Sequence, residues 1–313
     1  GICTLQVNTA SNNTAVGSCA LRSNTTASNN TAVGFYALRS NTTGTSNTSI
    51  GGSALRTNTV GRFNTAVGYR ALRDNVSGEY NTALGLSALA QNTGGCNTAV
   101  GGDSLYSNTT GFNNTALGSA ALYKNTTGVN NTAVGRTALL NNTVGTRNTA
   151  VGRSALRANV TGNSNVAVGY YAAYNSAGAS DSVAVGDSAL RANTASNNTA
   201  VGSCALCSNT TGTQNVAVGN RVFNYNSVGS YNTAVGFHAA YTLTSGTYNV
   251  AMGRTALRNV LAGSNNVALG GSALRNVSNA SNNVGVGHLA LYVNTVSNNV
   301  AVGFSALRYN ATG

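Results

Sequence analysis

The sequence predicts an all-β fold: a parallel β-solenoid (β-roll) of about eighteen turns of 16–17 residues, continuous as one domain over residues 1–313. Three observations lead to this prediction. The motif Asn-Thr/Val-Ala-Val-Gly recurs along the whole chain, its spacing is nearly constant, and the composition combines 38 Gly with no Pro and only 7% charged residues. Regular self-similarity of this kind is typical of repeat proteins, in which each unit contacts its neighbours.

The spacing of the motif defines the repeating unit. Its first residue stands at positions 13, 30, 47, 64, 81, 97, 114, 131, 148, 165, 182, 198, 215, 232, 249, 266, 283 and 299. Fourteen of the seventeen intervals are 17 residues long, and the other three are 16. The short intervals all lose one residue from the same loop, just before Asn97, Asn198 and Asn299. A deletion confined to one loop indicates that each repeat is one structural turn.

Each turn is expected to contribute one short strand and one further buried residue. Along the strand Thr14–Val16 successive side chains point to opposite faces. Because Val replaces the Thr in seven repeats, we expect Thr14 and Val16 to point inward and Ala15 outward. The Leu21 column is expected to be buried as well. The columns of small residues that begin at Ala15 and Ala20 would then suit tight lateral contacts between chains, as in a trimer.

Two columns of asparagine run through the repeats. One begins at Asn13 and is interrupted only by Ser182, whereas the other begins at Asn24. Stacked Asn side chains can satisfy corner amides that a solenoid otherwise leaves unpaired. We therefore expect two Asn ladders. The Gly and β-branched spacing holds no amphipathic helical stripe.

The repeat resembles a known family. The segment Asn165-Val166-Ala167-Val168-Gly169 is similar to the head repeats of trimeric autotransporter adhesins, which form left-handed parallel β-rolls. The longer unit from Asn114 to Gly128 resembles repeats of phage tail fibres and related large surface proteins. The resemblance covers essentially the whole chain, and it implies a left-handed, trimeric, extracellular fibre. Here the repeat is a few residues longer than the autotransporter unit.

A strip of Arg and Tyr is the most informative surface feature. The chain has 17 Lys and Arg against five acids, a net charge of +12, and basic chains often bind nucleic acid or anionic surfaces. Four consecutive Arg about 5 Å apart would repel by about 0.8 kcal/mol per adjacent pair even in water. The strip is read either as a solvated edge or as a surface that contacts acidic glycans, another subunit or, less favoured, nucleic acid. It comprises Arg22, Arg39, Arg56, Arg73, Tyr106, Tyr123, Arg157, Tyr174, Arg191, Tyr241, Arg258, Arg275, Tyr292 and Arg308.

Two covalent modifications are considered. Asn-x-Ser/Thr sequons recur in the return loops, and N-glycosylation is considered at Asn24, Asn41, Asn108, Asn125 and Asn209. Alignment of the repeats puts Cys3 one turn below Cys19, within the separation that a disulfide needs. Either a disulfide or two free thiols would be compatible with the fold.

No residue pattern points to enzymatic chemistry, and we expect neither catalytic residues nor a cofactor or metal. The two His, at 238 and 288, have no partner at ligand spacing. The five acids form no pair in neighbouring turns for general acid–base chemistry. Cys204-x-x-Cys207 lacks a second pair. No run of 18 apolar residues predicts a membrane span.

The sequence favours a non-enzymatic structural protein, an extracellular filament or adhesin shaft at a cell or virion surface. Two alternatives stay open: a viral tail fibre that reads a host surface, and an ice-binding solenoid with Thr rows such as Thr25, Thr42 and Thr109. Neither end shows a polar capping segment, so we expect a segment of a longer fibre that associates head to tail or as a trimer.

Overall fold

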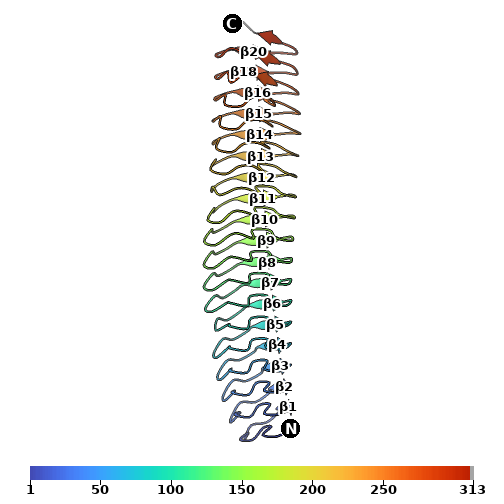
Figure 1. The fold of residues 1–313 in the computed structure, drawn as a ribbon, viewed down its shortest axis with the longest axis vertical. Helices are drawn as coiled ribbons and strands as arrows, with labels where there is room; N and C mark the ends of the chain where they lie inside the picture. The colour runs from blue at the N-terminus through green and yellow to red at the C-terminus, as the bar shows by residue number, and fades with distance from the viewer. Residues whose placement is uncertain (311–313) are drawn as a thin grey trace. The chain divides into compact units, whose positions relative to one another are not determined.

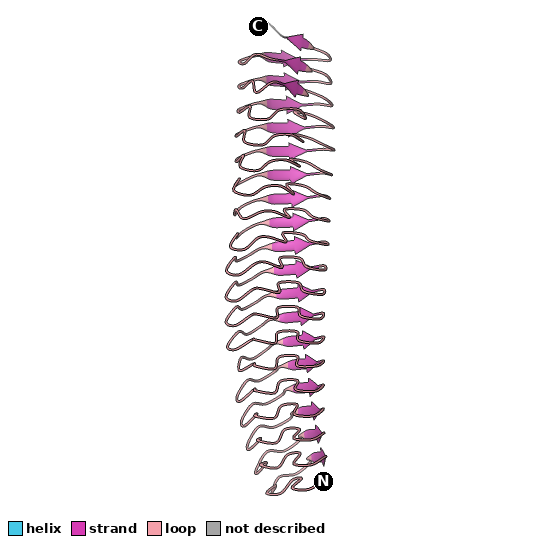
Figure 2. Ribbon diagram, viewed as in Figure 1, coloured by secondary structure: helices cyan, strands magenta, loops and turns pink. Residues whose placement is uncertain are grey.

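The computed structural model describes residues 1–310. It contains short strands joined by turns, and no helix occurs in this range (Figure 2). The chain divides into two compact units, Gly1–Thr161 and Gly162–Gly313. Each unit is a parallel β-solenoid with turns of about 17 residues, which confirms the predicted fold class. Left-handed winding and one continuous domain stay predictions.

The first unit stacks one strand per turn in chain order (Figure 1). Neighbouring strands pair in parallel, and each residue faces its equivalent in the next turn, as Thr14 faces Thr31. The strands are β1 (Thr14–Val16), β2 (Thr31–Val33), β3 (Thr48–Ile50), β4 (Thr65–Val67), β5 (Thr82–Leu84), β6 (Thr98–Val100), β7 (Thr115–Leu117), β8 (Thr132–Val134) and β9 (Thr149–Val151).

The second unit repeats this arrangement and adds a small parallel sheet in its last turns. The main strands are β10 (Val166–Val168), β11 (Val183–Val185), β12 (Thr199–Val201), β13 (Val216–Val218), β14 (Thr233–Val235), β15 (Val250–Met252), β16 (Val267–Leu269), β18 (Val284–Val286) and β20 (Val300–Val302). The small sheet consists of β17 (Asn276–Val277), β19 (Val293–Asn294) and β21 (Tyr309–Asn310).

The three 16-residue turns keep the register of the sheet. Thr82 pairs with Thr98, Val183 with Thr199 and Val284 with Val300, as the equivalents 17 residues apart do elsewhere. The missing residue is therefore absorbed in the loop before the strand. The interpretation of each repeat as one turn is confirmed.

The predicted facing of the strand is wrong. The central Ala points inward and is fully buried in most turns, for example at Ala66, whereas the flanking Thr and Val lie at the surface. The interior is thin, and only small residues occupy this position. Where Ser49 replaces the Ala, its Oγ reaches across the turn to the carbonyl oxygen of Ala54 at 2.8 Å. A Cβ added at Gly285 would lie only 3.2 Å from the Leu274 side chain.

The Ala20 column is buried too, as Ala20 and Ala37 illustrate. Both small-residue columns therefore fill the core instead of forming the lateral contacts that we expected of them. The thin interior accounts for their composition, because a turn of 17 residues encloses little more than a Leu side chain and two methyl groups.

The Leu column is buried, as the sequence predicts. The sequence did not predict the backbone conformation of these Leu residues. Leu38, Leu72 and Leu122 are fully buried, and each has a φ close to +50°. The left-handed conformation costs an L-residue about 1–2 kcal/mol. Burial of a Leu side chain contributes about 1.5–3 kcal/mol, so the packing gain offsets the backbone cost.

Two separate constraints, the backbone conformation and the space available, require the Gly at the end of each strand. Gly68 has a φ of +133°, a region that residues with a Cβ rarely adopt. A Cβ there would also lie 2.4 Å from the carbonyl oxygen of Gly85 in the next turn. The backbone turns at this corner can therefore stack closely only because the side chain is absent.

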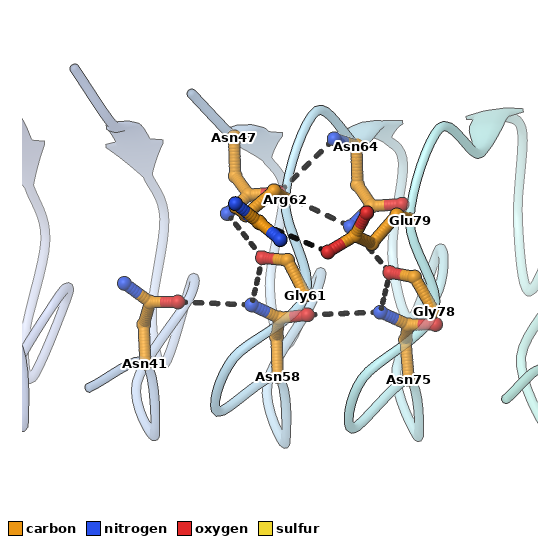
Figure 3. Close-up of polar contacts among 9 residues, drawn as sticks. All are labelled: Asn41, Asn47, Asn58, Gly61, Arg62, Asn64, Asn75, Gly78 and Glu79. Atoms are coloured by element: carbon orange, nitrogen blue, oxygen red, sulfur yellow. Dashed lines mark hydrogen bonds and ion pairs between the residues drawn. The ribbon is translucent and has the colours of Figure 1, made fainter. Parts of the chain in front are cut away.

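The Asn24 column forms the first predicted ladder (Figure 3). Asn58 Nδ2 donates to Asn41 Oδ1 at 2.9 Å, and Asn75 Nδ2 donates to Asn58 Oδ1 at 2.8 Å. The second amide hydrogen of Asn58 goes to the carbonyl oxygen of Gly61 in the same turn at 3.0 Å. These Asn are fully buried, and their amides have good partners. The ladder prediction is confirmed.

The Asn13 column forms a second ladder along the start of the strands. The backbone N and the Nδ2 of Asn64 donate to Asn47 Oδ1 at 3.0 and 3.1 Å (Figure 3). Asn47 Nδ2 donates to Gly61 O at 2.8 Å, so this carbonyl also accepts from the first ladder. The two ladders are therefore tied together at the return loop.

The first ladder is interrupted in the second unit. Ser176 occupies the Asn position in one turn, and Leu243, Val260 and Val277 occupy it in three successive turns; all four are buried. At the edge of this interruption, Asn226 Oδ1 is buried without a hydrogen-bond partner among residues 1–310. An aliphatic column is thus a workable alternative to the ladder, but the junction leaves an acceptor unpaired.

Replacing Leu72 by Ala should lower the free energy of unfolding by about 2–5 kcal/mol, because it leaves a cavity in a core that is one residue wide. Urea unfolding followed by circular dichroism measures the change. Val76→Ala in the same turn, at a side chain that is 45% exposed, is the matched control and should cost under about 0.5 kcal/mol. Equal effects of the two substitutions would contradict the assigned core.

Replacing Asn58 by Leu should cost about 2–5 kcal/mol, because it orphans Asn41 Oδ1 and one Nδ2 hydrogen of Asn75, two buried groups at about 1–3 kcal/mol each. The same unfolding assay applies. The control is Val260→Leu, which exchanges aliphatic residues at the same turn position where no ladder exists. A loss no larger than that of the control would show that the ladder does not stabilise the turn.

Candidate functional site: the arginine and tyrosine strip

The strip residue directly follows the left-handed Leu of each turn, which directs its side chain to the surface. Backbone hydrogen bonds hold successive members in register. Ser23 N donates to Arg39 O at 3.0 Å, and Ser40 N donates to Arg56 O at 3.1 Å. Neighbouring members are therefore about 4.8 Å apart, the spacing of strands in a sheet.

In the first unit, aromatic rings and one carboxylate compensate the positive charge. The guanidinium carbons of Arg39 and Arg56 lie 4.6 and 5.5 Å from the ring centroid of Tyr36. Arg73 forms a two-bond ion pair with Asp74, with Nε to Oδ1 at 2.8 Å. The hydrogen bond to Asp74 raises the pKa of Arg73 further above its ordinary value. The expected repulsion within this Arg run is thus offset locally.

Further along the first unit, Tyr106 and Tyr123 continue the strip as a stacked pair. Their ring centroids are 5.3 Å apart, and the ring planes are within 11° of parallel. Their spacing follows from the rise of one turn, which suits offset stacking of rings in register.

Arg22 is exposed and Arg157 half-buried.

In the second unit, two Tyr of the strip lie beside Arg of neighbouring turns. Arg258 lies 5.7 Å from the ring centroid of Tyr241. Arg275 Nη1 donates to the hydroxyl of Tyr292 at 3.0 Å, and Arg308 lies 5.8 Å from the same ring. A Tyr between two Arg holds both planar cations against its faces, at about 0.5–1 kcal/mol each when exposed.

The two remaining strip residues of the second unit stand beside aromatic or thiol groups. Tyr174 meets Tyr171 edge to face at 4.8 Å. Arg191 is exposed and lines a hollow of about 370 Å³ together with Cys204 and Cys207. Burial is the main reason that the pKa of the Cys207 thiol is raised, so this thiol is protonated at neutral pH.

The five Asn considered for glycosylation are not accessible. All are fully buried members of the first ladder: Asn24, Asn41, Asn108, Asn125 and Asn209. A glycan would have to be attached at Nδ2, and at Asn41 this atom donates one hydrogen to Asn24 Oδ1 of the preceding turn and the other to Gly44 O of the same turn. The structure therefore corrects this expectation. Sequons with exposed Asn lie elsewhere, for example at Asn29 and Asn113.

Cys3 and Cys19 lie in successive turns, as the alignment predicts. The backbone N of Cys19 donates to the carbonyl oxygen of Ile2 at 2.9 Å, which fixes this register. Both residues are half-buried free thiols in the structure.

Sequence reasoning missed a group of residues at the two variable positions after the motif Gly. In the second unit these positions hold Phe237, His238 and Arg254, which lie next to the strip residues Tyr241 and Arg258. The available signal was the absence of any Asp or Glu after Asp187, over a segment with six Arg.

Within residues 1–310, no three His, Cys, Asp or Glu side chains lie close enough together to hold a metal ion. The same range contains no helix of the length and hydropathy that a membrane span requires.

The strip can therefore act chemically as a row of planar cations and rings, which suits ligands with anionic groups and flat faces. In comparisons with known proteins, no protein family matches the chain, and no curated protein is significantly similar to it.

Proposed function

We propose that this protein is a non-enzymatic structural component of an extracellular fibre, in which copies associate side by side through the outward face of their strands. The observation that carries the proposal is an aliphatic ladder at the third strand residue. This residue points outward, yet it is aliphatic in all eighteen repeats: Val16, Val33, Ile50, Val67, Leu84, Val100, Leu117, Val134, Val151, Val168, Val185, Val201, Val218, Val235, Met252, Leu269, Val286 and Val302.

The aliphatic ladder is substantially exposed. Leu84 is 47% and Met252 44% exposed, and every other member is either exposed or half-buried. Single exposed aliphatic residues are ordinary, but a contiguous apolar strip within each unit supports an interaction surface.

Strand propensity alone does not account for the aliphatic ladder. The first strand residue has a comparable exposure, and there Thr occurs in eleven repeats and Val in seven. If only a β-branched residue were needed, Thr should also occur in the aliphatic ladder, because Thr favours strands as well. Thr is absent from all eighteen positions, which supports a surface from which water is excluded.

A second copy is the occupant that best fits this surface. Two identical ladders share one repeat distance, so their side chains can interlock along the whole contact. In the second unit the first strand residue is also mostly Val, as at Val166 and Val216, which widens the apolar face. This proposal places the protein at a cell or virion surface as a filament or adhesin shaft, and it leaves the strip free to contact acidic glycans.

Four substitutions in the aliphatic ladder, Val67→Thr, Val100→Thr, Val134→Thr and Val151→Thr, should weaken association. Each removes about one buried methyl group, about 0.8 kcal/mol, so the set should reduce the association constant roughly a hundredfold. Analytical ultracentrifugation and electron microscopy measure the loss of assemblies.

The control exchanges four first strand residues, Thr65→Val, Thr98→Val, Thr132→Val and Thr149→Val, and should preserve assembly. Unchanged circular dichroism in both variants shows that the turns still fold. A wild-type protein that stays a monodisperse monomer at high concentration would overturn the proposal.

A second candidate function, ice binding, is favoured by a specific observation. The loop Thr at 25, 42 and 109, which we first considered for this role, donate their hydroxyls to backbone carbonyls of the next turn. The Thr of β1–β9 instead point outward in nine successive turns, and their hydroxyls make no hydrogen bond within residues 1–310. Hydroxyls about 4.8 Å apart in a regular row could order water as a lattice.

Thr82→Lys tests this candidate, because a charged side chain on the Thr row would break its regular surface. If the row binds ice, thermal hysteresis of the wild-type protein should be measurable and should be largely lost in this variant. Thr110→Lys, in an exposed return loop, should keep it. A wild-type protein without thermal hysteresis would rule the candidate out and leave the fibre proposal unaffected.

A further inference from the structure

A surface hollow of about 260 Å³ lies on the second unit, across the turns that begin at Asn232, Asn249 and Asn266. It combines residues of the strip with residues at the two variable positions after the motif Gly. The hollow is lined by Phe237, His238, Arg254, Thr255, Arg258, Ser272 and Arg275. Its size suits a single sugar ring or a group of similar volume.

The charge around the hollow is uncompensated. Three of its lining residues are Arg, and no Asp or Glu follows Asp187 in the sequence. Both ion pairs of the described residues, Arg62–Glu79 and Arg73–Asp74, lie in the first unit. The hollow therefore presents three guanidinium groups without a carboxylate of the chain to neutralise them.

Hydrogen-bond donors are available at the same place. The Nε atoms of Arg258 and Arg275 are buried and have no acceptor among residues 1–310. Each guanidinium group carries further N–H donors beside Nε, and these suit an anionic ligand. The hydroxyls of Thr255 and Ser272 lie 2.9 Å apart and add further polar atoms to the lining.

A stack of rings borders the hollow on one side. Phe237 and His238 stack with centroids 3.9 Å apart, and His238 and Tyr241 stack at 4.7 Å. Phe237 is 47% exposed, so it offers an open apolar face. Such a face can cover the C–H face of a sugar ring, because that contact removes apolar surface from water on both sides.

We propose that this hollow binds an acidic sugar, a pyranose that carries a carboxylate or sulfate group. Arg254, Arg258 and Arg275 hold the acidic group, and Phe237, which stacks on His238, covers the ring. A free inorganic anion would use the guanidinium groups but gain nothing from the rings. A neutral sugar would use the rings but leave the guanidinium charges uncompensated. The site does not depend on whether copies of the protein assemble.

His238 should make this binding pH-dependent. Burial, followed by the charges of Arg258, Arg221 and Arg254, lowers the pKa of His238 below its usual 6.5, and no acidic group opposes them. A bound anion favours the protonated imidazole and so raises this pKa. Affinity should therefore increase as the pH falls through the range below 6.5.

Isothermal titration with four probes tests the proposal: tetragalacturonate, a sulfated galactan tetrasaccharide, maltotetraose and inorganic sulfate. At least one acidic tetrasaccharide should bind, and it should bind at least about tenfold more tightly than maltotetraose or inorganic sulfate. The two acidic probes distinguish a carboxylate ligand from a sulfate ligand. No binding of either, or equal binding of the neutral sugar, would overturn the proposal.

Variants separate this site from a general effect of charge. Arg254→Gln with Arg258→Gln should weaken binding of the acidic tetrasaccharide about tenfold or more. The matched control, Arg136→Gln with Arg22→Gln, removes the same charge at the same two turn positions in the first unit and should change affinity less than about twofold. Phe237→Ala should weaken binding of the acidic tetrasaccharide more than binding of inorganic sulfate, because only the sugar contacts the ring. Equal losses in the two Arg pairs would indicate diffuse attraction instead of a site.

Discussion

The hydrogen bonds that each buried Asn makes to the preceding turn are the interaction on which the rest of this structure depends. A turn of 17 residues encloses one Leu and two Ala side chains, too small a core to fix a unique arrangement by packing alone. The Asn amides supply what the core lacks, because they link successive turns through hydrogen bonds in a water-excluded position, as Asn58 does with Asn41 and Asn75. They also fix the register, since a slip of one residue would orphan the whole ladder.

The register of the turns also determines which residues form columns on the surface. Because equivalent residues stack directly, any residue type preferred at one turn position becomes a continuous column, and single side chains become ladders and strips. The same geometry places Tyr292 between Arg275 and Arg308, and within each unit it aligns the aliphatic residues of the third strand position. A residue that differs between repeats therefore lies directly beside the equivalent residues of the turns before and after it.

The sequence was sufficient to predict the solenoid, the Leu column and both ladders, because each appears as strict spacing. It was insufficient to predict which residues of the strand point inward. Val16 was expected to point inward because Val replaces Thr at the first strand residue of seven repeats, whereas the thickness of the interior, which takes only Ala, Ser or Gly, is a three-dimensional property. The left-handed Leu38 was equally hidden, since Leu rarely adopts this conformation. The cluster around Arg254 and His238 lies at positions that vary between repeats, so no column pointed to it.

The direction of the ladder bonds has a consequence for how the chain acquires its structure. In both ladders the Nδ2 atom of a turn donates to Oδ1 of the turn before it, as Asn58 donates to Asn41 and Asn64 to Asn47. A completed turn therefore offers ready acceptors to the segment that follows it. A further turn can then form on the edge of a completed one. The solenoid serves as its own template, and each added turn becomes the surface on which the next one forms.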